Sequence, residues 1–145
     1  MQLVEKGIQA NQLKEPFRSA YDACKIAKGI LAGGIAEKQG DYHLARQHFT
    51  DTVDAEDSLI YIEPREWPIP ARQYAGNLLL LRGDYNESIS VFQRDLQNNP
   101  VNGWSLTGLK RAYKATHEES GIVKISSPLK ESWQIKDIRV ESLVF

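Results

Sequence analysis

The chain has 145 residues, of which 41% are hydrophobic and 26% charged, and its formal net charge is −1. This length suits one domain with a buried core, and the composition excludes a disordered chain. The 18 basic and 19 acidic residues are mixed along the chain, which argues against a nucleic-acid arm or a membrane-surface patch.

The cysteine count and the apolar runs indicate a soluble protein of a reducing compartment. Cys24 is the only cysteine, so an internal disulfide and a cysteine zinc site are excluded, and its place on an apolar stripe favours packing over reactivity. The beginning, MQLVEKGIQANQLKEP, has charges and glycine where a signal peptide needs an apolar run. The longest apolar stretch, residues 78–81, is too short to span a bilayer. We therefore expect a cytoplasmic location.

The first part of the chain predicts two helices joined by a tight turn. Pro16 is placed to occupy the first turn of a helix that runs to Lys38. Gly40 predicts the end of that helix, and Asp41 is placed to cap the next one. The stripe expected on the first helix consists of Phe17, Tyr21, Cys24, Lys28 and Leu31. The residues that keep the helical period in the second are Leu44, Ala45, Phe49 and Val53.

Residues 55–70 carry three prolines and interrupt this helical pattern. Pro70 is then placed to open a new helix, which Gly83 ends. Asp84, followed three residues later by Glu87, predicts a capping box at the start of the next helix. The inner stripe expected on that helix consists of Tyr85, Ile89, Phe92 and Leu96.

The last part of the chain predicts one clear helix and one short helix. Asn102 is placed to cap a helix that carries Leu106, Leu109, Ala112 and Tyr113. Ser127-Pro128 predicts a cap and a first-turn proline for a short helix through Trp133. The ending, IRVESLVF, is apolar and β-branched, so we expect it to dock on the helices of the chain.

Two copies of one pattern lie 43 residues apart. The first copy consists of Gly33, Gly40-Asp41-Tyr42, Ala45 and Phe49, and the second of Gly76, Gly83-Asp84-Tyr85, Ser88 and Phe92. Small residues where helices touch, a Gly-Asp turn and an anchoring aromatic are typical of a helix–turn–helix solenoid. The pattern resembles the tetratricopeptide repeat, whose unit of about 34 residues closes on a proline, as Pro100 does here. The surplus of about nine residues falls in the proline-rich segment.

This resemblance implies an all-α fold, a short solenoid of about two and a half tetratricopeptide-like hairpins with a C-terminal tail packed back. The expected segments of this single domain are an N-terminal helical extension (1–25), repeat one (26–57), a connector (58–68), repeat two (69–100), a partial third repeat (101–120), and a C-terminal helix and tail (121–145). The runs AEDSLIYIEPREWPIPAR and ESWQIKDIRVESLVF are further similar to the C-terminal module of larger bacterial tetratricopeptide-repeat proteins of poorly defined function. We accordingly expect a stand-alone module or a truncated relative.

A concave groove lined by the first helix of each hairpin is the expected binding surface for a protein or peptide. Its candidate residues are Gln73, Asn77, Trp104, Thr107, Arg111 and Lys114. Amides hydrogen-bond a peptide backbone, and Arg or Lys holds a carboxylate. The alternatives are that these side chains are only solvated and that Trp104 wedges between repeats. Binding of a chaperone C-terminus is disfavoured, because Ile30 and Gly34 stand where that pattern needs Lys and Asn.

The connector is the second candidate site, because long ordered loops are disproportionately functional. It contributes Glu63 and Trp67, and Arg72 follows it. A small-ligand pocket of an enzyme accessory domain, formed by these three residues and Arg111, is the rival to the peptide groove. The structural alternative is that the prolines stiffen the path while the aromatic residues cover an edge of the stack.

No arrangement of residues for catalysis is found, and a non-enzymatic protein is expected. His43 and His48 are five residues apart, which does not place them on one helix face as a metal pair. No phosphate loop or nucleophile elbow occurs, and we expect no cofactor, no metal and no nucleic acid. A short stack leaves an uncovered end, which a second copy of the chain could cover. A homodimer and a self-associating fragment are therefore kept as alternatives.

Overall fold

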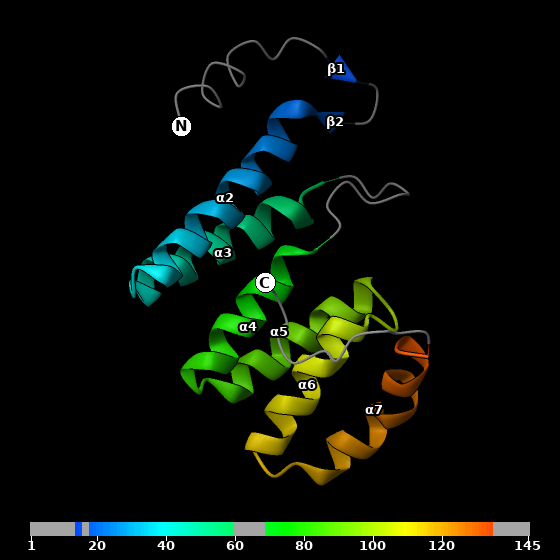
Figure 1. The fold of residues 1–145 in the computed structure, drawn as a ribbon. Coiled ribbons are helices and arrows are strands. Elements are labelled where there is room, and N and C mark those ends of the chain that lie inside the picture. Colours follow the sequence, from blue (N-terminus) through cyan, green and yellow to red (C-terminus); the bar gives the residue numbers. More distant parts are fainter. Residues whose placement is uncertain (1–13, 16–17, 60–68, 135–145) are drawn as a thin grey trace. The chain divides into compact units, whose positions relative to one another are not determined.

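The computed structural model describes residues 14–15, 18–59 and 69–134, and it confirms the all-α class (Figure 1). A short antiparallel pair precedes the helices, with Lys14 opposite Ser19 and Glu15 opposite Arg18. The described elements are β1 (Lys14–Glu15), β2 (Arg18–Ser19), α2 (Ala20–Lys38), α3 (Tyr42–Asp57), α4 (Ala71–Arg82), α5 (Tyr85–Asn98), α6 (Gly103–Ala115) and α7 (Glu119–Ser132). The helices pack as sequential antiparallel pairs. The chain divides into two compact units, Met1–Ala71 and Arg72–Phe145.

The first unit is built on the hairpin of α2 and α3, in which two glycines let the helices approach closely. Gly33 lies on the ring of Phe49, and Gly29 lies on the side chain of Thr52, so a Cβ at either glycine would clash. Phe49 and Ala45 are fully buried there, and Ile26 and Ala36 of α2 are at most 2% exposed.

Two predictions for the first helix are wrong. It begins at Ala20 and not at Pro16, because Arg18–Ser19 pair as a strand. The predicted stripe is also displaced, since Leu31 is 65% exposed. The face that α3 covers is instead the one that carries Gly29 and Gly33, because only residues without a side chain allow this contact distance.

The two helical hairpins that carry the duplicated pattern turn in the same way. Gly40 and Gly83 have φ values of 80° and 85°, in the left-handed region that favours glycine. The N–H of Asp41 donates to the carbonyl of Ala36 at 2.9 Å, and the N–H of Asp84 donates to that of Leu79 at 2.9 Å. Both helices therefore end in a Schellman-type turn, as Gly40 and Gly83 predicted.

The helix caps only partly follow the predictions. Asp41 accepts a hydrogen bond from the N–H of Leu44 at 3.0 Å, and Asn102 accepts from the N–H groups of Trp104 and Ser105 at 3.0 and 3.3 Å. Both caps are confirmed. The capping box at Asp84 is wrong, because its side chain makes no cap hydrogen bond.

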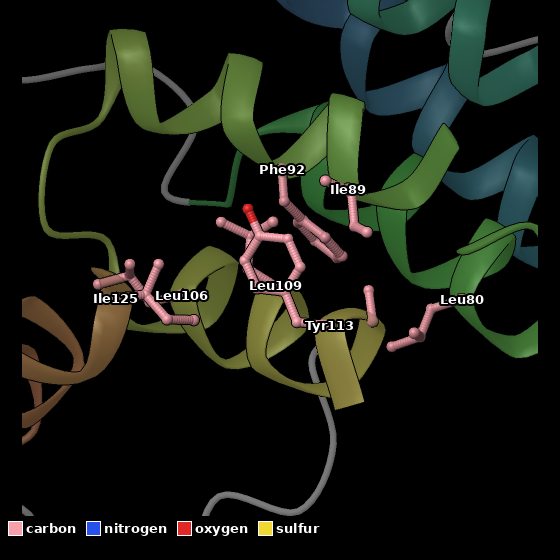
Figure 2. Packing of buried hydrophobic residues seen from close by; sticks show 8 residues of the cluster. Leu80, Ile89, Phe92, Leu106, Leu109, Tyr113 and Ile125 are labelled. Atoms are coloured by element: carbon pink, nitrogen blue, oxygen red, sulfur yellow. The ribbon is translucent and has the colours of Figure 1, made fainter. Parts of the chain in front are cut away.

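The second unit holds a hydrophobic core centred on Phe92 of α5 (Figure 2). Gly76 of α4 and Gly108 of α6 both lie against its ring. Ser88, one turn before Phe92, is buried and donates to the carbonyl of Gly76 at 2.9 Å. The rest of the core cluster is formed by Leu80, Ile89, Leu106, Leu109, Ala112, Tyr113 and Ile125. The expected inner stripes of α5 and α6 are thus confirmed at their buried positions.

A buried carboxylate joins α5 to α6. Asp95 is 1% exposed. It accepts hydrogen bonds from the hydroxyl of Ser105 at 2.5 Å and from the amide of Asn99 at 2.8 Å. A carboxylate is tolerated in such a place only when its oxygens are hydrogen-bonded. The junction therefore fixes how α6 leaves α5.

The last helix is longer than predicted. Ser127-Pro128 does not open α7, which begins at Glu119 and contains Pro128 in its interior. Proline removes only one helical N–H, and Pro128 lies within five residues of the helix end. Burial of Ile125 and partial burial of Leu129 against the core hold both sides of the proline in one helix.

Several expectations concern segments outside the described residues. They are the connector residues Glu63 and Trp67, the docking of the ending IRVESLVF, and most of the N-terminal extension. In the part of the chain that the structure describes, no helix combines the length and apolar character needed to cross a bilayer.

Candidate functional site

A groove of about 570 Å³ lies between α6 and α7 in the second unit. Its apolar lining comes from Ile122, Ile125 and Leu129 of α7 and from Trp133, which caps that helix. Its polar lining is contributed by Thr107, Lys110, Arg111, Lys114, Ser126 and Lys130. The groove is therefore walled by two antiparallel helices, with an apolar stripe on one of them.

The apolar floor continues the core of the second unit. Ile125 belongs to the core cluster, and Ile122 and Leu129 are partly buried against it. Figure 2 shows Ile125 of α7 close to Leu106 of α6. The lining residues Ile122, Ile125, Leu129 and Trp133 are spaced by three, four and four positions, which aligns them along one face of a helix. Because the floor is packed from beneath, its shape is set before any ligand arrives.

Trp133 closes one end of the groove. Its indole N–H donates to the hydroxyl of Thr107 at 3.2 Å. Its ring meets that of Trp104 edge-on, with centroids 5.2 Å apart and planes at 89°. Gly103 makes room for it, since a Cβ there would come within 2.7 Å of the indole. The two tryptophans thereby tie the beginning of α6 to the end of α7.

The rim of the groove is cationic. Lys110, Arg111 and Lys114 project from α6, and Lys130 lies on the α7 side. Lys110 is half-buried, and the other three are exposed. None of the described lining residues is acidic. This arrangement favours a ligand that brings carboxylates to the rim and apolar groups to the floor.

The two hydroxyls of the groove are already engaged. The Thr107 hydroxyl donates to the carbonyl of Gly103 at 2.7 Å and accepts from Trp133. The Ser126 hydroxyl donates to the carbonyl of Ile122 at 2.7 Å. The other polar side chains of the described lining are three lysines and an arginine, which donate hydrogen bonds and accept none.

The structure brings together only part of the predicted binding surface. Thr107, Arg111 and Lys114 line the groove, and Trp104 stands behind Trp133 at its end. This groove lies within one helical hairpin, whereas the predicted groove runs across the first helices of successive hairpins. The remaining predicted residues, Gln73, Asn77 and Arg72, lie on α4 and are 1%, 6% and 8% exposed.

The predicted residues on α4 are all buried polar side chains. Both amide atoms of Gln73 are buried and have no hydrogen-bond partner. Burial also raises the pKa of the neighbouring Tyr74 above its usual value of 10.0. A buried amide without partners costs free energy. None of these α4 residues lines the α6–α7 groove.

Sequence reasoning missed seven of the ten described residues that line the groove. They are Lys110, Ile122, Ile125, Ser126, Leu129, Lys130 and Trp133. The helical spacing of the apolar residues from Ile122 to Trp133 was the signal that would have found the apolar wall. Pro128 obscured it, because a helix start at Ser127 separates Ile122 and Ile125 from Leu129.

The described residues give no indication of a metal centre, since no group of three or more His, Cys, Asp or Glu side chains gathers there.

No protein-family model matches the chain, and no curated protein matches it significantly. The fold and the groove therefore define the class of this protein only as an all-α domain of helices packed in sequence.

Proposed function

We propose that this chain is a non-enzymatic protein-interaction module. Its binding surface is the groove between α6 and α7, and its partner is a segment that is both apolar and acidic. One observation carries the proposal: an apolar floor continuous with the core lies beneath a rim of four cationic side chains, without an acidic residue among the described lining. The tetratricopeptide-like nature of the hairpins is part of the same proposal.

The two halves of the groove supply different parts of the binding free energy. Burial of apolar side chains on the floor provides affinity, at about 25 cal/mol per Å² of apolar area removed from water. The cationic rim selects acidic partners and speeds their association, and salt weakens both effects. Such a surface recognises a class of segment by the joint presence of apolar and acidic residues.

A charge-reversal experiment tests this proposal. The probes are a 14-residue peptide of Leu, Glu and Ala, a scrambled peptide of the same composition, and a peptide with Lys in place of Glu. We expect the first peptide to bind the wild-type protein, and the double variant Lys110→Glu/Lys114→Glu to lose at least about tenfold in affinity. The Lys peptide should bind that variant better than it binds the wild type. Anisotropy of labelled peptides measures all three affinities.

The matched control keeps the net charge of the variant and leaves the groove intact. Lys28 and Lys124 are exposed, and neither lines the groove. Lys28→Glu/Lys124→Glu should therefore bind the acidic peptide nearly as well as the wild type. Equal losses in the two double variants, or no binding of any peptide at millimolar concentration, would contradict the proposal.

The rival small-ligand pocket has no observation in its favour. Two of its four residues, Glu63 and Trp67, lie outside the described part of the chain. Arg72 is buried, while Arg111 is exposed on the rim of the α6–α7 groove. Self-association stays a prediction, and light scattering that gives only the 16.4 kDa mass would remove it.

A further inference from the structure

We infer that the partner segment binds in the α6–α7 groove as an α-helix of about three turns, with acidic residues along one edge. This inference rests on the proposed function and adds the conformation and charge pattern of the partner. Three features of the groove carry it: its hydrogen-bonding capacity, the length of its apolar stripe and the spacing of its cations.

The hydrogen-bonding capacity of the described groove favours a helix over an extended segment. Each residue of an extended peptide brings one N–H and one C=O that need partners once they are buried. The groove has helical walls, whose own main-chain groups are bonded within the helices apart from the helix ends and the carbonyl four residues before Pro128. The Thr107 hydroxyl already donates and accepts, and lysine and arginine side chains accept nothing. Among the described lining residues, the hydroxyls of Thr107 and Ser126 are the side chains that can still accept a hydrogen bond. A helix needs none of these partners, because it satisfies its own main chain.

The apolar stripe has the length and spacing of a helix-binding surface. From Ile122 to Trp133 it follows one helix face, and at 1.5 Å per residue it extends roughly 16 Å. A partner helix of about three turns covers that length. Side chains spaced by three and four positions form the ridges that interlock in helix packing. The surface thus matches the helix-in-groove mode of peptide recognition.

The spacing of the cations sets the charge pattern of the partner. Lys110 and Lys114 are one helical turn apart on α6, about 6 Å along its axis. Carboxylates four positions apart on a partner helix repeat at the same distance. An extended peptide would instead place them two positions apart. The partner helix is therefore expected to carry Glu or Asp at positions i and i+4, beside its apolar stripe.

Proline substitution in the peptide separates the two conformations. The probes are the 14-residue Leu/Glu/Ala peptide with Glu at i and i+4, the same peptide with one central Ala→Pro, and the same peptide with Pro at its first position. The central proline breaks the helix and should weaken binding by roughly a hundredfold, whereas proline at the first position should be tolerated. A fourth probe, with Glu at i and i+2, should bind more weakly than the first.

Two readouts keep this inference distinct from the proposed function. Carbon-13 chemical shifts of the labelled, bound peptide should report helix, and its affinity should fall in Lys110→Glu/Lys114→Glu. If the central-proline peptide binds as tightly as the parent, and charge reversal still weakens both, the helical inference is wrong and the proposed function stands. If no peptide binds the wild-type protein, both are wrong.

Discussion

Close contacts between a helical glycine and an aromatic ring recur in this protein. Gly33 lies on Phe49 in the first unit, and Gly76 lies on Phe92 in the second, where a Cβ would come within 2.7 Å of the ring. Each glycine lowers the stability of its own helix, by about 1 kcal/mol relative to alanine. In return, the absence of a side chain lets the two helices pack closely. The pair recurs 43 residues apart, so the same exchange is made twice.

Two adjacent glycines of α2 provide a matched test of this packing. Gly33→Ala should lower the free energy of unfolding by about 1–2 kcal/mol, because the new methyl group meets the ring of Phe49. Gly34→Ala should leave it unchanged or raise it by up to about 1 kcal/mol, because a Cβ there meets nothing within 4 Å. Urea unfolding followed by circular dichroism measures both. A Gly33→Ala protein as stable as Gly34→Ala would show that the contact is not limiting.

The unit of this fold is the helical hairpin, and its two duplicated turns differ in one hydrogen bond. Both turns have a glycine with positive φ and the same main-chain bond back to the preceding helix. Asp41 also caps α3 through its side chain, whereas Asp84 leaves α5 without a side-chain cap. Equivalent residues in equivalent turns are thus expected to contribute differently to stability.

Alanine substitution of the two aspartates should have effects of different size. Asp41→Ala should destabilise the protein by about 1 kcal/mol, because the N–H of Leu44 loses its acceptor. Asp84→Ala should cost only a few tenths of a kcal/mol, since no cap hydrogen bond is lost. Thermal unfolding of both variants under one buffer condition compares them. Equal losses would mean that the cap at Asp41 contributes nothing.

At the scale of the whole chain there are two compact units, and Phe92 organises the core of the second. Gly76 and Gly108 come from different helices and both touch its ring. Gly33 belongs to the other compact unit. Residues that share a partner couple energetically, and residues in separate cores do not.

This division predicts which double variants are additive. The losses from Gly33→Ala and Gly108→Ala should add to within about 0.5 kcal/mol, whereas those from Gly76→Ala and Gly108→Ala should deviate from their sum by more than that. The reason is that one ring cannot move away from two new methyl groups independently. Urea unfolding of the three single and two double variants gives both coupling energies. Strong coupling between Gly33 and Gly108 would contradict two separate cores.

Sequence reasoning predicted where the helices begin and end better than it predicted which of their faces are buried. Turn chemistry is local, so Gly40, Gly83 and Asn102 marked helix ends and a cap correctly. The buried face of α2 was placed wrongly, because a glycine surface carries no hydrophobic signal and Leu31 does. Pro128 was likewise predicted to open a helix, as proline in a first turn often does. Packing of residues on both sides of it instead keeps it inside α7.

By itself, the sequence determined the all-α class and the duplicated hairpin turn. These follow from interactions over a few residues, which one chain segment specifies alone. Only the tertiary structure decided that the apolar residues of α7 lie opposite the cations of α6. That alignment depends on Trp133 packing on Gly103 and on Ile125 entering the core, contacts between residues far apart in the chain.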